Sequence, residues 1–321
     1  RGCSSLTAVT LPNTLTHMGV EVFADCESLT SLTAPYAGMN EAGQDTVGYL
    51  FGGSDRIPHT LTNITVTKAT AIGSYAFEGC NNVEAVSLPD SVKSIGYGAF
   101  NGCTKLTSLR LPAGLTQLGC DAFRNCISLR SVAIPAGVRT LPAGTFADCT
   151  GLQTVTLPNG LEQIETDAFA NCTSLTLLDI PESVKLLQSN ALGGCTGLET
   201  LTIPFLGESA DAPMPLSGLF GAPLHGLKTL TVRNTTEIVD MAFQGFDSLQ
   251  SVTLQGTATR VGSRAFEKCT SLQSVTLPDT VTDMGEYAFA ECVSLPAVVL
   301  PAELTEISEG VFAGCSSLKR I

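Results

Sequence analysis

The chain has 321 residues, of which 30 are Asp or Glu and 17 are Lys or Arg, so its formal net charge is −13 at pH 7. A negative field of this size, with scattered basic residues, argues against nucleic acid and anionic membrane surfaces as partners. Hydrophobic residues make up 44% of the sequence, yet no apolar run approaches the roughly 20 residues that a membrane-spanning helix needs.

A period of 23 residues organises most of the chain, and the cysteines reveal it. Eleven of the twelve cysteines fall into three runs with a step of 23 residues: Cys3 and Cys26; Cys80, Cys103, Cys126, Cys149, Cys172 and Cys195; Cys269, Cys292 and Cys315. Apolar positions recur with the same period. This period lies within the length range of leucine-rich repeats.

Each repeat is predicted to contain the same elements in chain order. The segment Leu-x-x-Val-x-Leu-Pro is predicted to be a short strand with its apolar positions inward, ended by proline. The following Ile-Gly pair is predicted to be a turn in which glycine adopts a positive φ. Ala-Phe-x-x-Cys is predicted to be a single helical or 3-10 turn with Phe and Cys inside. Stacked repeats would then share one continuous core.

Two interruptions break the period, one between Cys26 and Cys80 and one between Cys195 and Phe246, which occupies a cysteine position. Each is too long for one repeat and holds two repeats plus extra residues. The segments 35–52 and 204–221 match one another, so we expect one variant repeat type used twice, with insertions near 35–57 and 204–223. Residues 1–321 are thus predicted to be a single array of about thirteen repeats plus a partial one. Since both ends lie inside repeats, we expect a fragment of a longer protein.

The recurring pattern Cys-x-x-Leu-x-x-Val-x-Leu-Pro-x-x-Leu-x-x-Ile-Gly-x-x-Ala-Phe-x-x-Cys closely resembles the BspA-like class of bacterial leucine-rich repeats. The resemblance extends from Cys3 to Ile321 apart from the two insertions. It implies an α/β repeat solenoid, a right-handed superhelix with a parallel β-sheet on the concave face and short helical or 3-10 turns on the convex face. It also implies a surface or secreted protein of a host-associated bacterium, several such proteins being adhesins, and it brings no catalytic residues.

The regular cysteines allow a metal or disulfide interpretation, but zinc sites need clustered pairs such as Cys-x-x-Cys, and none occurs. Because Phe246 replaces a cysteine, the ladder is interpreted mainly as buried, reduced thiols that behave as small hydrophobic side chains. Cys120 lies off the ladder, directly after Gly119, and is the thiol to test for reactivity.

Histidines are few, which argues against a Ser-His-Asp or Cys-His mechanism, since the chain contains only His17, His59 and His225. No metalloprotease, phosphate-binding or Ca²⁺-binding motif accompanies them, so we expect no enzymatic activity, metal or cofactor. His59 and His225 follow the two insertions at matching places. Shared origin explains this match, and a ligand role is the alternative.

Thirteen strand positions are predicted to face solvent on the concave side, and nine of them are Ser or Thr. They are Thr10, Thr33, Thr65, Ser87, Arg110, Ala133, Thr156, Asp179, Thr202, Thr231, Thr253, Thr276 and Val299. One interpretation is that threonine suits a pleated surface and pairs across strands. The other is a hydroxyl-rich platform for a glycan or an extended polypeptide, with Arg110 and Asp179 as its charged positions.

The insertions supply a second group of candidate binding residues, because long loops on rigid scaffolds often carry binding. These candidates are Tyr36, Glu41, Asp45, Tyr49, Glu208 and Asp211. Tyr36 and the acidic residues are expected to project, whereas Phe51 and Phe220 are expected to fill the core position of the repeat phenylalanine. Tryptophan is absent, so aromatic platforms typical of sugar sites are expected to be scarce.

The sequence thus favours an extracellular or cell-surface, adhesin-like recognition module that binds a host or bacterial protein or glycan. The alternative is a structural spacer or stalk that presents another domain of a larger surface protein. A hydrolase is the third and least favoured hypothesis. Neither nucleic acid binding nor membrane insertion is expected, and the sequence leaves the oligomeric state open.

Overall fold

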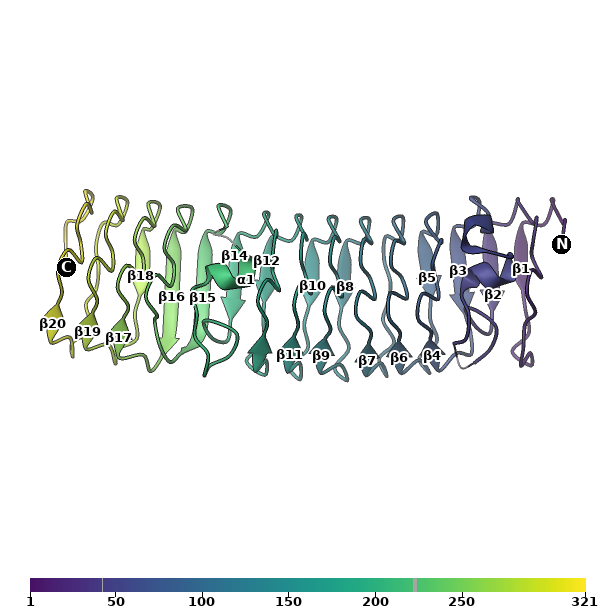
Figure 1. Ribbon diagram of the computed structural model, residues 1–321, viewed down its shortest axis with the longest axis horizontal. Coiled ribbons are helices and arrows are strands. Elements are labelled where there is room, and N and C mark those ends of the chain that lie inside the picture. Colours follow the sequence, from purple (N-terminus) through teal and green to yellow (C-terminus); the bar gives the residue numbers. More distant parts are fainter. Residues whose placement is uncertain (42, 222–223) are drawn as a thin grey trace. The chain divides into compact units, whose positions relative to one another are not determined.

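The computed structural model describes residues 1–41, 43–221 and 224–321. The chain forms two compact units, Arg1–Cys172 and Thr173–Ile321. In each unit, successive repeats form coils that lie side by side (Figure 1). Residues 42, 222 and 223 belong to the predicted insertions 35–57 and 204–223 and lie outside the described residues, so these insertions are described in part.

Most regular coils carry two strands, a main one and a two-residue one. The main strands of the first unit are β1 (Ala8–Thr10), β2 (Ser31–Ala34), β3 (Asn63–Val66), β5 (Ala85–Ser87), β8 (Ser131–Ala133) and β10 (Thr154–Thr156). Those of the second unit are β12 (Leu177–Asp179), β14 (Thr200–Ile203), β15 (Thr229–Thr235), β16 (Ser251–Gly256) and β18 (Ser274–Thr276). The pairs between these strands are parallel.

The main strands follow from the alternation of side chains. In β5 the middle residue, Val86, is buried while Ala85 and Ser87 are exposed, as expected when successive side chains point to opposite faces of a strand. The predicted strand is therefore confirmed, although it is shorter than the apolar segment Leu-x-x-Val-x-Leu that predicted it.

The two-residue strands form a second ladder, which the Ile-Gly pattern did not predict (Figure 1). They are β4 (Ala71–Ile72), β6 (Ser94–Ile95), β7 (Gln117–Leu118), β9 (Thr140–Leu141) and β11 (Gln163–Ile164) in the first unit, and β13 (Leu186–Leu187), β17 (Arg260–Val261), β19 (Asp283–Met284) and β20 (Glu306–Ile307) in the second. The isoleucine is thus in a strand, and the prediction of a turn was wrong there. Two residues are too few for strand alternation to be recognised.

The glycine that follows this strand is required by a close backbone contact. The prediction of a positive φ was wrong, since the positive φ falls two residues later, as at Gly98 (φ 54°). A Cβ on Gly96 would lie 2.6 Å from the backbone nitrogen of Ser74 in the preceding coil. A Cβ on Gly119 would lie 2.4 Å from that of Tyr97. These glycines therefore let adjacent coils approach.

The wall that carries Ala-Phe-x-x-Cys consists of successive tight turns. Asn101 N donates to Gly98 O (2.9 Å) and Cys103 N to Phe100 O (3.1 Å), which is the i→i−3 pattern of a 3-10 helix. Left-handed residues such as Gly98 (φ 54°) and Gly102 (φ 76°) interrupt the pattern before a helix can form. The predicted placement of Phe and Cys inside is confirmed.

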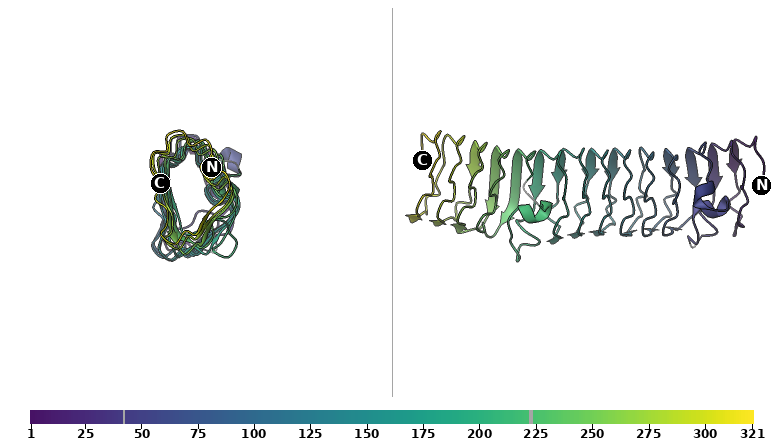
Figure 2. Two further views of the ribbon diagram at one scale, coloured as in Figure 1. Left: turned by 90° about the vertical axis from the view of Figure 1, so that its left-hand side faces the viewer. Right: turned by 45° about the horizontal axis from the view of Figure 1, so that its top comes forward.

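The helices of the described residues belong to the variant repeats. They are the 3-10 helices η1 (Val47–Leu50) and η2 (Ser54–Arg56) and the α-helix α1 (Ser217–Phe220). The helical turns η1 and η2 project from the wall of the coils (Figure 2). The two variants share their backbone bonding, because Phe23 N donates to Leu50 O (2.8 Å) in one and Leu192 N to Leu219 O (3.0 Å) in the other.

Stacked phenylalanines form the centre of each core. In the first unit Phe77, Phe100, Phe123, Phe146 and Phe169 stack with centroid separations from 4.5 to 5.7 Å. In the second unit Phe243, Phe266, Phe289 and Phe312 stack with separations from 4.7 to 5.8 Å. Such pairs add about 0.5–1.5 kcal/mol beyond the burial of their area. Phe51 and Phe220 are buried, as predicted.

Candidate functional site

The predicted outward positions form a row within each unit, interrupted in the first unit at Arg110, and we call it the hydroxyl row. In the first unit Thr10, Thr33, Thr65 and Ser87 are register partners, and so are Ala133 and Thr156. In the second unit the partners are Asp179, Thr202, Thr231, Thr253 and Thr276. These side chains are exposed or half-exposed. Their predicted position is confirmed, and their role in binding stays a prediction.

The hydroxyls of this row differ from those nearby in their hydrogen bonding. No hydrogen bond of the nine Ser and Thr side chains to another described residue is found. Threonines three residues before the row positions behave differently, since Thr30 Oγ1 donates to Thr7 O (2.9 Å) and Thr107 Oγ1 to Glu84 O (3.3 Å). The expected hydroxyl pairing across strands is therefore absent from the row in the described part of the chain, and its donors and acceptors remain open to a ligand.

The two charged positions of the row are ion-paired. Arg110 Nη1 lies 2.9 Å from Asp90 Oδ1, and both side chains are highly exposed. Asp179 Oδ1 lies 2.9 Å from Arg233 Nη2, and Arg233 Nη1 also donates to Ile180 O (2.9 Å). The variant repeat lengthens β15, and Arg233 in this longer strand reaches Asp179. Sequence reasoning missed Arg233, and Asp179 is consequently a paired charge.

A groove of about 520 Å³ lies beside the second variant repeat. Its lining includes Glu182, Lys185, Phe205, Asp211, Arg233 and Asn234. Phe205 is buried and Asp211 is exposed, as expected for that acid. The groove therefore combines an apolar floor with charged groups of both signs, next to the paired Asp179 of the hydroxyl row.

Glu208, a second insertion candidate, does not project. Its Oε1 accepts hydrogen bonds from the backbone nitrogen of Ser189 (3.2 Å) and from the Ser189 hydroxyl. The prediction that this carboxylate projects was wrong, because the preceding coil supplies donors within reach.

Tyr36 likewise does not project, and that prediction was wrong. The ring is 2% exposed and the hydroxyl donates to Leu15 O (3.1 Å). The Lys68 ammonium lies 5.7 Å from the ring centroid and 3.6 Å from Glu41 Oε2. Hydrogen bonding to Tyr36 is the largest of the interactions that raise the pKa of Lys68. The apolar ring is buried in the variant coil, and the Leu15 carbonyl provides the hydrogen-bond partner that a buried tyrosine hydroxyl needs.

The remaining candidates of the first insertion differ in exposure. Asp45 is exposed and has a φ of 61°, whereas Tyr49 and Glu41 are partly buried. Of the six insertion candidates, Asp45 and Asp211 are thus the most accessible. No observation assigns either of them a ligand.

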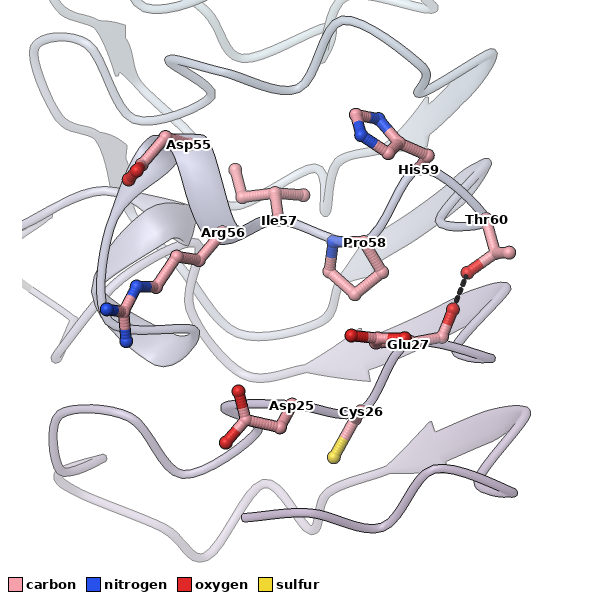
Figure 3. Close-up of a pocket in the computed structure, with 9 residues that line it drawn as sticks. All are labelled: Asp25, Cys26, Glu27, Asp55, Arg56, Ile57, Pro58, His59 and Thr60. Carbon is pink, nitrogen blue, oxygen red and sulfur yellow. Dashed lines mark hydrogen bonds between the residues drawn. The ribbon is translucent and has the colours of Figure 1, made fainter.

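A second pocket, of about 430 Å³, lies between the first variant repeat and the preceding coil (Figure 3). Asp55 and Arg56 come from η2, and His59 follows beyond Pro58. Cys26 is buried at its base. Thr60 Oγ1 donates to Glu27 O (2.7 Å) and so closes one side. No nucleophile adjoins a base in this arrangement.

The histidines make surface hydrogen bonds. His59 Nδ1 lies 3.0 Å from Asn82 Nδ2, and Lys105 Nζ donates to Asn82 Oδ1 (2.8 Å). His225 Nδ1 lies 2.9 Å from Asp247 Oδ1, and that ring is 74% exposed. Neither contact activates a hydroxyl or thiol. Among the described residues, no group of three or more His, Cys, Asp and Glu is placed to hold a metal ion.

The ladder cysteines are free thiols, and most of them are buried. They are also hydrogen-bond donors, which the sequence did not suggest. Cys126 Sγ lies 3.2 Å from Phe100 O, and Cys292 Sγ lies 3.1 Å from Phe266 O, each acceptor being in the preceding coil. Burial raises the pKa of Cys103 to about 12, so the thiol keeps its proton at neutral pH. Cys120, the off-ladder thiol, is half-buried.

Comparison with known proteins identifies the family. The model of the BspA type leucine rich repeat region matches in six copies, over residues 1–55, 70–204 and 227–321. The chain belongs to the BspA-type leucine-rich repeat family. The unmatched residues 56–69 and 205–226 fall within the variant repeats. The predicted resemblance and fold class, a leucine-rich-repeat solenoid, are confirmed.

Solved structures include similar proteins. A leucine-rich repeat protein from Bacteroides ovatus is 25% identical with a TM-score of 0.53, over 98% of this chain and 80% of that one. A leucine rich cell surface protein from Faecalibacterium prausnitzii is 26% identical with a TM-score of 0.48, over 98% of this chain and 81% of that one. No curated protein matches.

Family membership indicates a protein-interaction or recognition module. Leucine-rich repeat proteins are typically non-enzymatic and commonly bind other proteins. Within the described ranges, no helix has both the length and the apolar character needed to cross a membrane.

Proposed function

We propose that this BspA-type chain is an adhesin-like recognition module, exposed outside the cell, that binds a protein ligand in extended conformation along the hydroxyl row. The observation that carries the proposal is the row of Ser and Thr hydroxyls to which the described residues supply no hydrogen-bond partner. A hydroxyl both donates and accepts, so such a row suits the alternating N–H and C=O groups of an extended backbone.

The groove beside the second variant repeat would supply specificity. Lys185 and Arg233 lie there with Glu182 and Asp211 around the buried Phe205. Mixed charges orient a ligand and reject mismatched ones more than they add affinity. We therefore expect the ligand to place an apolar side chain toward Phe205 and charged side chains at the groove edge.

Binding to immobilised fibronectin, laminin and collagen, measured by biolayer interferometry, tests the proposal. The test variant carries Thr202→Val, Thr231→Val and Thr253→Val, which remove hydroxyls and keep β-branched shape. We expect it to lose at least tenfold in affinity for a ligand that the unaltered chain binds. The matched control carries Thr282→Val and Thr305→Val, whose hydroxyls donate to Thr259 O (3.2 Å) and Thr282 O (3.1 Å).

Unchanged affinity of the Thr202, Thr231 and Thr253 variant would reject the hydroxyl row as the binding surface. Uniformly negative binding by folded chain would favour the spacer hypothesis. A spacer also predicts that removal of whole repeats leaves the activity of the complete surface protein unchanged.

A further inference from the structure

Two exposed tyrosines of the first unit lie together, away from the hydroxyl row. Tyr75 and Tyr97 lie in successive coils, three residues after β4 and two residues after β6 respectively, and they are 40% and 44% exposed. Their ring centroids are 5.2 Å apart and their planes are inclined at 70°. Large aromatic side chains this exposed on a solvent-facing wall are unusual and often mark a binding site.

The backbone supports this arrangement. Tyr75 adopts a φ of 55°, at a position where the next two coils carry Gly98 and Asp121. A Cβ on Gly98 would lie 2.9 Å from the Tyr75 ring. Because glycine has no side chain, the ring can pack against the backbone of the next coil. One side of the Tyr75 ring is thereby fixed, and the exposed part faces solvent.

Polar side chains continue from the aromatic pair across the next coils. A hydrogen bond with Asp121, assisted by one with Tyr75, raises the pKa of Tyr97 to about 12. Arg124 Nη1 donates to Asp121 Oδ1 (3.2 Å), and Arg124 Nη2 lies 3.1 Å from Asp148 Oδ2. Aromatic faces, acceptors and donors thus follow one another over four coils, which are spaced by about 4.8 Å.

We propose that Tyr75, Tyr97 and Asp121 form a binding site for a neutral oligosaccharide. The C–H face of a pyranose ring stacks on an aromatic side chain, while its hydroxyls require neighbouring acceptors and donors. Asp121 and Arg124 lie next to Tyr97 and bond to one another. A carboxylate has about four acceptor positions and a guanidinium about five donors, so both groups keep hydrogen-bonding capacity for a sugar. This site and its ligand class are independent of the protein ligand proposed for the hydroxyl row.

Other ligand classes fit the site less well. A proline-rich peptide inserts between aromatic rings that form a slot, whereas the planes of Tyr75 and Tyr97 are inclined at 70°. An anionic sugar would face the carboxylates of Asp121 and Asp148 and a chain with a net charge of −13. Arg124 is already paired with both carboxylates, so it offers little free positive charge.

Tyr287 of the second unit provides a matched control. Like Tyr75, it adopts the left-handed conformation (φ 54°), and it occupies the same repeat position as Tyr75. Gly310 of the next coil lies against its ring. However, the Arg264 guanidinium lies 5.3 Å from the ring centroid and covers it. The Tyr287 hydroxyl donates to Glu309 Oε1 (3.0 Å). Its ring is therefore not available for stacking, and Tyr287→Ala should not affect sugar binding.

Saturation-transfer NMR of the whole chain with cellohexaose, xylohexaose, mannohexaose and chitohexaose tests the proposal. We expect at least one of these neutral sugars to bind, with at least a tenfold loss of affinity in Tyr97→Ala and in Tyr75→Ala and no loss in Tyr287→Ala. Tyr97→Leu, which keeps apolar volume without an aromatic face, should lose as much as Tyr97→Ala. Sialyllactose should bind more weakly than the neutral sugars.

Absence of binding by all four sugars at millimolar concentration, with the chain folded by circular dichroism, would overturn the proposal. So would binding that survives in Tyr97→Leu, which guards against an unfolded alanine variant. The variant with Thr202, Thr231 and Thr253 replaced by Val should keep sugar binding. The failure of one proposal is therefore distinguishable from the failure of the other.

Discussion

Replacing Phe123 by alanine is expected to destabilise the first unit strongly, because its ring is 1% exposed and packs between two others. Phe100 and Phe146 lie at centroid distances of 5.2 and 5.3 Å, with planes within 10°. Loss of a buried phenylalanine costs about 3–5 kcal/mol. Of this, the two stacked pairs account for about 0.5–1.5 kcal/mol each. The free energy of unfolding, measured by urea denaturation with far-UV circular dichroism, should fall accordingly.

Phe312→Ala is the matched control for this prediction. Phe312 is half-buried and stacks with one ring, that of Phe289, at 5.8 Å, so we expect a loss of about 1–2 kcal/mol. Because each repeat contacts its neighbours only, amide exchange in Phe123→Ala should accelerate in adjacent coils first. Equal losses in the two variants, or a loss below about 1 kcal/mol for Phe123→Ala, would refute the importance of the central stack.

Three further substitutions or conditions test the packing. Gly119→Ala should cost about 1–3 kcal/mol through its 2.4 Å backbone contact, whereas Gly19→Ala, whose Cβ would meet an atom at 3.9 Å, should be nearly neutral in urea denaturation. Burial raises the pKa of Cys103 and Cys269 to about 12, so above about pH 8.5 the unfolded thiols ionise while the folded ones stay protonated. Stability should then fall by about 1.4 kcal/mol per pH unit for each thiol up to pH 12, and the urea midpoint should fall less between pH 8 and 10.5 when both are replaced by Ala. Arg233→Met should cost about 1 kcal/mol through loss of its bonds to Asp179 and a backbone carbonyl, and an unchanged thermal midpoint would contradict this.

The hydroxyl row illustrates how sequence and structure contribute differently to the candidate site. The outward position of Thr202 or Thr253 follows from strand alternation and was predicted correctly. Their hydroxyls have no hydrogen-bond partner among the residues that the structure describes, while Thr30 and Thr107 donate to a neighbouring coil. This difference depends on the distance between coils. The aromatic pair of the first unit was likewise not predicted, because Tyr75 and Tyr97 become neighbours only through stacking.

The 23-residue period, the buried Phe and Cys positions, the main strands and the leucine-rich-repeat fold could all be predicted from the sequence. Each of these depends on local spacing, because one repeat specifies its own coil and every coil is alike. The variant repeats were also located from sequence, by the match between 35–52 and 204–221.

The side-chain contacts between coils became visible only in the tertiary structure. The pairing of Arg233 with Asp179 joins residues 54 positions apart. The buried Tyr36 hydroxyl donates a hydrogen bond to the carbonyl oxygen of Leu15 in another coil. The glycine of the Ile-Gly pair is required by a backbone in the preceding coil, which the sequence of one repeat does not contain. These contacts depend on how closely adjacent coils stack. The periodicity of the sequence does not specify that distance.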